Sequence, residues 1–347
     1  MALIETVPNI SEGRRKDVID AIVEAVRRSG PVRLLDLSSD PDHNRSVVTL
    51  AGEPEAVRSA LEALVAASVE RIDLRRHTGH HPRMGAVDVI PLVPIRDVGM
   101  EECVRLARSL GETIAARHGM PVYLYEEAAT ADHRRDLAAI RKGEFEGFAA
   151  KVRDPLWKPD FGPARVHPTA GCVAIGAREF LIAFNINLTT ADLEVARRVA
   201  KAVRHSSGGL RYVKAMGVML EERRQAQVSM NLTDFRRTPL HRVVEMVRSE
   251  AARWGVGIAG AEIVGLVPED ALVQAAEFYL RLEGFDAGRV LERRLAAAEA
   301  LTASVAPAPG AAARRGAGAR GRGQGRRRVV PGTADGRGRD QGPRRSG

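Results

Sequence analysis

Hydrophobic residues recur with helical or strand spacing along most of this 347-residue chain. In its first half the spacing predicts three helices and five strands. The helices are expected at 16–28, 54–72 and 100–117, and the strands at 3–7, 32–37, 47–51, 87–93 and 121–125. The first six of these elements follow the order β-α-β-β-α-β. This is the order of a ferredoxin-like unit, an antiparallel sheet with helices on one face.

The same plan returns in the second half, after two strands within 172–188 that a turn at 176–178 separates. Further helices are expected at 190–205, 239–254 and 269–282, and further strands at 213–220, 226–232 and 260–267. We therefore predict an α+β protein with one ferredoxin-like unit over 1–177, a second over 178–302, and a tail over 303–347.

Two stretches need separate treatment. Residues 132–162 contain two short helical segments and an irregular stretch, in which Trp157 and Phe161 are expected to be exposed or half-buried. Gly255, Gly257 and Gly260 spell the dinucleotide-binding pattern GxGxxG. They follow a predicted helix and precede a strand, which reverses the order that a dinucleotide-binding motif requires. We expect no nucleotide site there.

The net charge of +9 comes from the tail. From Ala303 onward the chain has eleven arginines and two aspartates, so 42 basic and 42 acidic residues remain in the rest. The tail is rich in Ala, Gly, Pro and Arg and lacks hydrophobic periodicity, which predicts disorder. Nucleic acid is therefore expected as a partner only through this basic tail, if at all.

The cysteine count and the apolar runs limit the class of protein. Cys103 and Cys172 are the only two cysteines, too few for a disulfide framework or a cysteine-rich zinc site. The first residues do not resemble a secretion signal, and no run of about 18 apolar residues occurs. We expect a soluble, cytoplasmic protein with no membrane partner.

The stretch LRRHTGHHPRMGAVD, residues 74–88, carries the densest chemistry in the chain. It brings three histidines, His77, His80 and His81, into a loop between a predicted helix and a predicted strand. Histidine is the usual proton carrier near neutral pH, and loops on a rigid scaffold commonly hold catalytic residues. The polar turn DPDHNRS at 40–46 belongs to the same unit, so we expect the two loops to approach one another.

A zinc site formed by His43, His77 and His80 is the alternative for these histidines. Neighbouring side chains of an extended backbone point apart, as His80 and His81 would, and no cysteine is close in sequence. We therefore predict no metal. His80 is expected to be a polar residue that supports the site.

Ordered motifs along most of the chain resemble those of the glutamate formimidoyltransferase family. They are VPNISEGR at Val7, NRSV at Asn44, RRHTGHHPRMGAVDVIPLVP at Arg75, PVYLYEEAA at Pro121, RKGEFEG at Arg141, PDFGP at Pro159, GAREFLIAFNINL at Gly176, QVSMNLTDF at Gln227 and EIVGLVP at Glu262. The resemblance covers about residues 2–296.

The resemblance implies two ferredoxin-like subdomains with facing β-sheets and external helices, a folate site between them, and a homodimer. It implies transfer of the formimidoyl group from N-formimidoyl-L-glutamate to N5 of tetrahydrofolate, a step of histidine breakdown and one-carbon metabolism. The catalytic histidine of the family falls on His81. The family's folate-contacting segment falls on Gly162, Pro163, Ala164, Arg165, Val166, His167, Pro168, Thr169, Ala170 and Gly171.

The sequence departs from the animal bifunctional members of this family in three places. They have an acidic residue where this chain has His80, and an aspartate at about the position of Ser38, whereas here the acids are Asp40 and Asp42. Those proteins continue into a cyclodeaminase domain. Here only the composition of the tail resembles the start of that domain, so we expect the second activity to be absent.

Formimidoyl transfer requires a proton to leave N5 and another to reach the departing glutamate nitrogen, and one histidine can do both in turn. Both substrates carry carboxylates, and folate also carries a glutamyl or polyglutamyl tail; arginine binds carboxylates in bidentate geometry. Arg45, Arg76 and Arg83 are the candidates, with loop-fixing ion pairs as the alternative for each. Asp88 either orients a histidine or caps a turn.

Asn185 and Asn187 stand at i and i+2 of an otherwise apolar strand and share one face of its sheet. They either line a cavity for the pterin or cap the ends of a strand ladder.

Two other functions remain open at this point. One is transfer of a formyl group between 5-formyltetrahydrofolate and glutamate, which needs the same folate slot and the same proton carrier. The other is a folate-binding or nucleic-acid-binding protein without catalysis.

Overall fold

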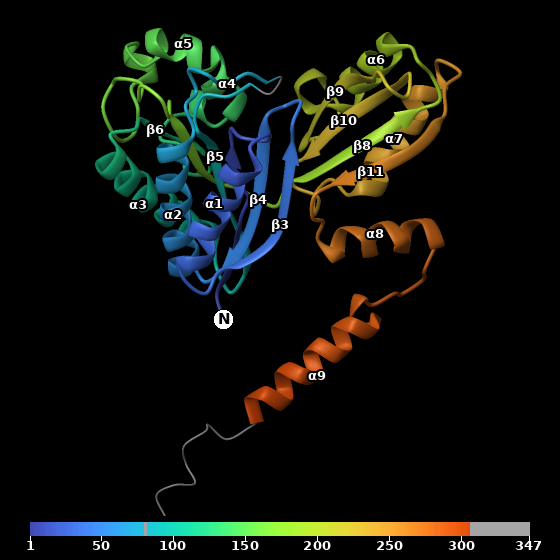
Figure 1. Ribbon diagram of the computed structural model, residues 1–347. Coiled ribbons are helices and arrows are strands. Elements are labelled where there is room, and N and C mark those ends of the chain that lie inside the picture. Colours follow the sequence, from blue (N-terminus) through green and yellow to red (C-terminus); the bar gives the residue numbers. More distant parts are fainter. Residues whose placement is uncertain (80–81, 306–347) are drawn as a thin grey trace, which may run out of the picture. The chain divides into compact units, whose positions relative to one another are not determined.

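The computed structural model describes residues 1–79 and 82–305, with the backbone alone over 300–305. The chain divides into one compact unit, Met1–Phe285, and a second, Asp286–Gly347. The first unit contains two β-sheets with their helices (Figure 1). In the second, a 3₁₀ turn (Ala287–Arg289) precedes the helix α9 (Leu291–Val305).

Seven strands form the first sheet: β1 (Leu3–Thr6), β2 (Asn9–Ile10), β3 (Arg33–Asp40), β4 (Arg45–Gly52), β5 (Val87–Arg96), β6 (Val122–Glu126) and β7 (Val173–Ala177). Both β1 and β2 lie between β4 and β5, and β3 pairs with β4, all antiparallel. This is the predicted ferredoxin-like order. The sheet then continues with β7, parallel to β5, and with β6, parallel to β7. The sheet is therefore mixed, whereas the sequence predicted an antiparallel one.

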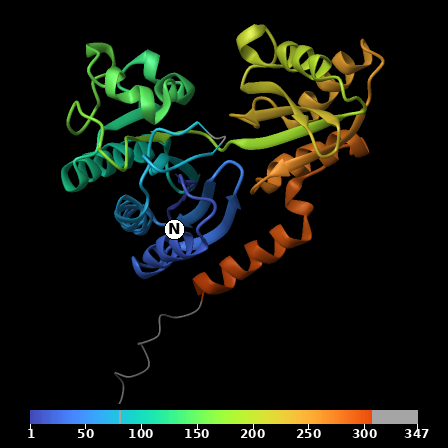
Figure 2. The same ribbon diagram turned by 45° about the horizontal axis from the view of Figure 1, so that its top comes forward.

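Helices cover both faces of this extension. The helices α1 (Lys16–Arg28), α2 (Pro54–Arg71) and α3 (Met100–His118) contribute to the main core of the sheet. The short helices α4 (Leu137–Arg141) and α5 (Glu144–Lys151) cover the other face (Figure 2, green). Along β6, Val122 and Leu124 pack in the main core, whereas Tyr123 and Tyr125 pack beside α4 and α5. The sequence predicted helices on one face of the sheet alone, and this prediction is wrong for the part of the sheet that β6 and β7 form. Strands that are buried on both faces lack the alternation of apolar and polar residues, so the sequence did not reveal the second layer of helices.

The second sheet is a ferredoxin-like unit without extension. Its strands are β8 (Ile182–Leu188), β9 (Val213–Leu220), β10 (Gln225–Leu232) and β11 (Ile258–Val264), in the order β11-β8-β10-β9 and antiparallel. The helices α6 (Leu193–Val203) and α7 (Leu240–Ala252) share its core, and α8 (Glu269–Leu280) follows β11. Gly255 and Gly257 of the GxGxxG pattern lie between α7 and β11, and Gly260 lies within β11, so the pattern follows a helix and leads into a strand, as predicted.

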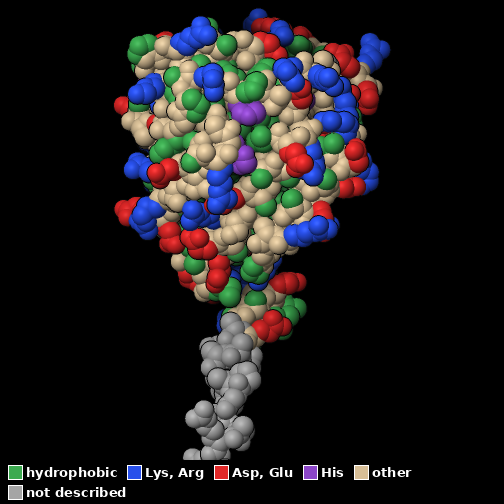
Figure 3. Space-filling model, turned by 60° about the vertical axis from the view of Figure 1, so that its left-hand side comes forward, with side chains coloured by type: hydrophobic (Ala, Val, Ile, Leu, Met, Phe, Trp, Pro, Cys, Tyr) green, Lys and Arg blue, Asp and Glu red, His purple; other side chains and the backbone are tan. Residues whose placement is uncertain are grey.

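Several details of the surface agree with the sequence. Trp157 and Phe161 are half-buried, as predicted. Acidic and basic side chains intersperse on the face that Figure 3 brings forward, in agreement with a balanced charge outside the tail. No helix in the described part of the chain is long and apolar enough to cross a membrane. The predicted disorder concerns 303–347, of which residues 306–347 lie outside the described part.

Candidate active site

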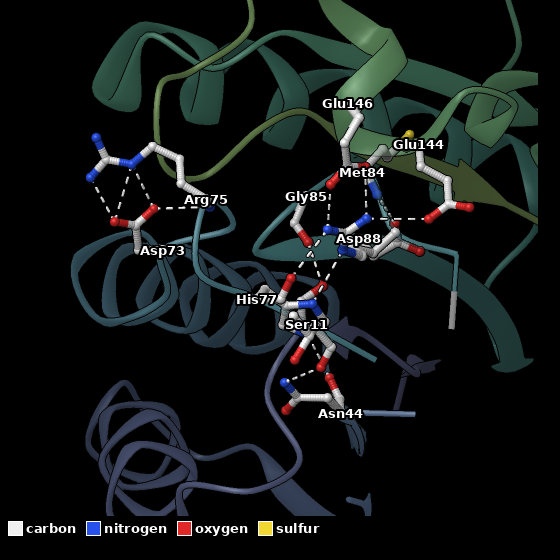
Figure 4. A network of polar contacts seen from close by, with 12 residues as sticks. Ser11, Asn44, Asp73, Arg75, His77, Met84, Gly85, Asp88, Glu144 and Glu146 are labelled. Carbon is white, nitrogen blue, oxygen red and sulfur yellow. Dashed lines mark hydrogen bonds and ion pairs between the residues drawn. The ribbon is translucent and has the colours of Figure 1, made fainter. Parts of the chain in front are cut away.

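The histidine loop joins α2 to β5, and the described residues on both sides of His80 and His81 are firmly held. His80 and His81 themselves lie outside the described residues, so their roles stay predictions. The contacts that fix the two flanks of the loop come from four other segments of the chain. Figure 4 shows the network.

Asn44 connects the polar turn 40–46 with the histidine loop, as the sequence led us to expect. Its side-chain amide donates to the carbonyl of Thr78 at 2.9 Å and accepts from the backbone N–H of Gly13, also at 2.9 Å. Its own carbonyl accepts from Nε2 of His77 at 2.8 Å. Asn44 is buried and has a φ of 48°, a left-handed conformation that asparagine tolerates better than most residues. One residue thus joins three segments.

His77 is held as a neutral ring. Nε of Arg83 donates to Nδ1 of His77 at 3.2 Å, so the ring proton resides on Nε2, which donates to Asn44. Burial lowers the pKa of His77, and the charges of Arg83 and Arg14 lower it further, although the bond to Asn44 acts in the opposite direction. Both ring nitrogens are occupied. His77 therefore acts as a fixed part of the loop.

Arg83 uses all five of its N–H donors within the protein. It is 8% exposed, and its guanidinium forms ion pairs with Glu146 at 2.6 Å and with Glu144 at 3.2 Å. Two bonds reach the carboxylate of Glu146, and two more reach Nδ1 and the carbonyl of His77. The backbone N–H of Phe145 also donates to the carbonyl of Arg83. Arg83 thus fastens the histidine loop to the start of α5.

Asp88 closes the other side of the loop. Its Oδ1 accepts from the backbone N–H of Met84 at 2.8 Å, and its Oδ2 forms an ion pair with Arg141. The residue is 1% exposed. Asp88 therefore caps the turn, and among the described residues it contacts no histidine side chain. Arg45 lies in the same charged group: burial lowers its pKa, as does Arg141, while Asp88 and Asp40 raise it.

The predicted folate segment packs directly against the histidine loop. Gly85 and Gly171 form an isolated β-bridge, and the backbone N–H groups of Ala86 and Cys172 donate to the carbonyls of Ala170 and Met84, each at 2.9 Å. The approach is so close that a Cβ on Gly85 would lie 1.8 Å from the carbonyl oxygen of Cys172. Gly85 and Gly171 are 86 residues apart in the sequence. The histidine loop and the predicted folate segment are therefore held together at these two glycines.

The rest of the segment over 162–171 is divided between a turn and an open stretch. Residues 167 and 171 exchange backbone hydrogen bonds at 3.1 Å, and Nδ1 of His167 accepts from the N–H of Ala170 at 2.9 Å. Burial lowers the pKa of His167, with smaller effects of His118 and Arg165. Gly162, Ala164 and Arg165 are exposed. The fixed turn thus leaves an accessible stretch beside the histidine loop.

The second sheet carries a connected set of polar side chains on the face away from its core. Asn185 donates to Oε1 of Glu262 at 2.9 Å, Gln227 donates to the same oxygen at 3.1 Å, and Gln227 also donates to Asn187 at 2.8 Å. Asn185 pairs with Ser229 inside the β8–β10 ladder, whereas Asn187 pairs with Gln227 at the end of that ladder. Asn185 is therefore not a cap at the end of the ladder. Oε2 of Glu262 has no partner among the described residues.

The acids near the position of Ser38 have structural roles. Asp40 accepts from the backbone N–H groups of Asp42 and His43, each at 2.9 Å, and pairs with Nδ1 of His43 at 2.7 Å. Burial raises the pKa of Asp40, but these bonds outweigh burial and the pKa is lowered. Asp42 is exposed. Over residues 1–79 and 82–305, no three His, Cys, Asp or Glu side chains are grouped as a metal site would require.

Comparison with known protein families shows to which family the chain belongs. A family model described as "Formiminotransferase domain, N-terminal subdomain" matches residues 3–178, and one described as "Formiminotransferase domain" matches residues 183–293. The chain belongs to the formiminotransferase family.

Similar proteins within the formiminotransferase family include two of nearly the same extent. A glutamate formimidoyltransferase of Streptococcus pyogenes serotype M1 is 46% identical over 84% of this chain and 98% of that protein. One of Thermoplasma acidophilum is 48% identical over 86% of this chain and 99% of that protein. The formimidoyltransferase-cyclodeaminase of Rattus norvegicus is 46% identical over 80% of this chain and 52% of that protein. The chain thus matches about half of the bifunctional relative.

Sequence reasoning missed several residues that organise this candidate site. Glu12 is 3% exposed and accepts from the backbone N–H groups of Arg14 and Arg15. Burial raises its pKa, but those bonds and the ion pair with Arg15 outweigh burial and lower it. Glu12 lies within the motif VPNISEGR, and Glu144 and Glu146 lie within RKGEFEG, so the motifs marked these residues without revealing their partners. Gln227 and Glu262 were marked in the same way.

Proposed function

We propose that this chain transfers the formimidoyl group from N-formimidoyl-L-glutamate to N5 of tetrahydrofolate, giving 5-formimidoyltetrahydrofolate and L-glutamate. The observation that carries this proposal is the match of both formiminotransferase models over 3–178 and 183–293, together with two glutamate formimidoyltransferases that the chain covers almost completely. The activity is that of a one-carbon transferase in histidine breakdown. Tetrahydrofolate is a co-substrate, and the mechanism uses no metal.

His81 is the proposed proton carrier. It accepts the proton from N5 as this nitrogen attacks the formimidoyl carbon, and it returns a proton to the glutamate nitrogen as the tetrahedral intermediate collapses. The described residues on either side of it support this role by holding the loop. His77, Arg83 and Asp88 anchor the flanks through five different contacts to Asn44, Glu144, Glu146, Met84 and Arg141. A fixed loop limits the orientations open to the catalytic ring.

Folate is proposed to contact the segment over 162–171. This proposal is supported by the bridge between Gly85 and Gly171, which joins the segment to the loop that carries His81 in the sequence. The pterin needs hydrogen-bond partners for its amino and amide groups, and Asn185, Asn187 and Glu262 offer amide and carboxylate groups on one face of a sheet. We assign the pterin to these side chains.

The arginines predicted to bind carboxylates divide by their surroundings. Arg83 is fully occupied by loop contacts, so we propose an anchoring role for it. Arg45 belongs to the charged group around Asp88, and we propose that it helps to position the loop. Arg76 is exposed, and its guanidinium forms no hydrogen bond or ion pair with the described residues, which leaves it available to a substrate.

We also propose that the protein works in the cytoplasm as a homodimer. Exposed apolar side chains on α8 support a surface for a second copy: Leu272, Phe278, Tyr279 and Leu280 are between 45% and 67% exposed. Large apolar side chains that stay exposed together are typical of interaction surfaces.

The direct test is an incubation of the purified protein with tetrahydrofolate and N-formimidoyl-L-glutamate, with both products measured. We expect 5-formimidoyltetrahydrofolate and L-glutamate to form in equal amounts. A parallel incubation with 5-formyltetrahydrofolate and glutamate examines the formyl reaction. Faster turnover in that second incubation, or folate binding without any turnover, would contradict the proposal.

A further inference from the structure

A cleft of about 430 Å³ opens where α1 begins and α2 ends, beside the histidine loop. Its volume falls within the range of about 300–1,000 Å³ that is usual for small-molecule sites. The charged side chains that line it are Arg14, Arg15, Arg71, Arg76, Glu12 and Asp73. Thr78 and the neutral ring of His77 contribute polar groups at its edge.

Both carboxylates of the cleft are neutralised by arginines. Glu12 forms an ion pair with Arg15 at 2.5 Å. Asp73 binds Arg75, which is outside the lining, through both carboxylate oxygens at 2.6 to 3.2 Å. These hydrogen bonds hold the pKa of Asp73 at about 2. Arg71 is in turn paired with Glu70 at 2.5 Å. Neither lining acid forms an ion pair with the remaining two cations, although the charge of Arg76 also contributes to the low pKa of Asp73.

Arg14 and Arg76 are those two cations. Nε of Arg14 donates to the carbonyl of Pro41 at 2.7 Å, and its Nη1 donates to the hydroxyl of Thr78 at 3.3 Å, so its guanidinium is oriented by neutral groups alone. Arg76 forms no ion pair within the described part of the chain. The positive charge of Arg14 also contributes to the low pKa of His77. The cleft thus holds two guanidinium groups that form no ion pair with a carboxylate among the described residues.

We propose that this cleft binds the two carboxylates of the acyl donor, one with Arg14 and the other with Arg76. The inference rests on the proposed function, because it names the subsite for the glutamate part of N-formimidoyl-L-glutamate. Arginine binds a carboxylate through two parallel N–H hydrogen bonds, and a site with two such pairs binds a dicarboxylate in preference to a monocarboxylate. The glutamyl tail of folate also carries carboxylates. The experiment therefore distinguishes binding of the acyl donor from binding of the folate tail.

The experiment compares Arg14→Gln and Arg76→Gln with a matched control, Arg27→Gln. Arg27 lies in the last turn of α1, is exposed, and is outside the lining of the cleft. Calorimetric titration with L-glutamate, in the absence of turnover, measures the subsite directly. Steady-state assays give KM for N-formimidoyl-L-glutamate and, separately, for mono- and polyglutamylated tetrahydrofolate.

We expect each of the two cleft variants to weaken L-glutamate binding and to raise KM for the donor by about 10- to 100-fold, as loss of a charge-assisted pair implies. KM for either form of folate should stay within about twofold, and Arg27→Gln should match the wild type within the same margin. Because the guanidinium of Arg76 forms no hydrogen bond or ion pair with the described residues, Arg76→Gln should keep the thermal stability of the wild type.

The inference would be overturned by unchanged glutamate binding in both variants, or by an equal loss in Arg27→Gln. A rise in KM for polyglutamylated folate without one for the donor would also overturn it and would assign the cleft to the folate tail. If the wild type binds L-glutamate through Arg14 and Arg76 yet transfers no formimidoyl group, the cleft is supported and the proposed reaction fails.

Discussion

Arg83 donates from Nε to Nδ1 of His77 at 3.2 Å, and this contact fixes a neutral tautomer in the loop that also contains His81 in the sequence. The remaining donors of Arg83 bind two glutamates of α5 and the carbonyl of His77. An arginine saturated in this way fastens a loop and has no donor left for a substrate.

Arg83→Lys should lower kcat by about 10- to 100-fold and the free energy of unfolding by about 1–2 kcal/mol, because lysine has three donors and no planar fork. KM for the acyl donor should change by less than about threefold. Steady-state assays and urea unfolding measure these quantities, with Arg75→Lys as the control. A large rise in KM at constant kcat would instead indicate that Arg83 binds the substrate.

Gly85 and Gly171 should tolerate no side chain. A Cβ on Gly171 would lie 2.1 Å from the carbonyl oxygen of Met84, and the φ of Gly171 is +70°. Gly85→Ala and Gly171→Ala are therefore each expected to lower the free energy of unfolding by about 2–4 kcal/mol and to weaken folate binding. Gly147→Ala, in α5, is the control, since a Cβ there meets nothing within 4 Å. Wild-type folate affinity in both loop variants would contradict the account.

Glu5 makes stability depend on pH. Burial raises its pKa from 4.5 to about 7, although the charge of Arg178 acts in the opposite direction. The folded state therefore holds this proton more tightly than the unfolded state does, and the resulting stability is complete below pH 4.5 and is lost as the pH rises through 7.

Glu5→Gln keeps the neutral form at every pH. It should therefore match the wild type in unfolding free energy at pH 4.5 and exceed it by about 3 kcal/mol at pH 8. Urea unfolding at the two pH values tests this, with Glu24→Gln on the exposed side of α1 as the control. An equal difference at both pH values would exclude titration of Glu5 as the cause.

Glu262 is expected to contribute to the binding of tetrahydrofolate and not to the binding of the acyl donor. Glu262→Gln keeps an oxygen that accepts from Asn185 and Gln227 but removes the negative charge that a pterin amino group would meet. We expect KM for tetrahydrofolate to rise about tenfold or more, with KM for the donor unchanged. Glu250→Gln on α7 is the control. The assignment of the pterin fails if both variants bind tetrahydrofolate as the wild type does.

The sequence predicted the elements well where one face of each is buried. The helix over 16–28 was predicted at its observed bounds, because Val18, Ile22 and Val26 recur with helical spacing. The strand over 213–220 was also predicted at its observed bounds. The approach of the turn 40–46 to the histidine loop followed from placing both in one ferredoxin-like unit, and Asn44 confirms it.

Partners distant in sequence could not be predicted. Nothing in local spacing says that β7 joins β5 in parallel, or that Gly85 meets Gly171, because such pairings depend on the whole path of the chain. The same holds for Arg83: its sequence context indicates a charged loop residue, and only the position of α5 reveals Glu144 and Glu146 as its partners. The sequence shows that a residue such as Arg83 can form ion pairs, whereas the fold determines which residues are its partners.

The central claim is that His81 moves the proton in formimidoyl transfer to bound folate, and a comparison of wild type and His81→Ala tests it most directly. Both proteins would first be shown to bind tetrahydrofolate equally, then be mixed with N-formimidoyl-L-glutamate, with 5-formimidoyltetrahydrofolate measured over time. We expect turnover by the wild type and less than about a tenth of it in His81→Ala, since a general acid–base contributes about 10²–10⁴-fold. Turnover above a tenth of the wild-type rate in the variant, at equal folate binding, would contradict the claim.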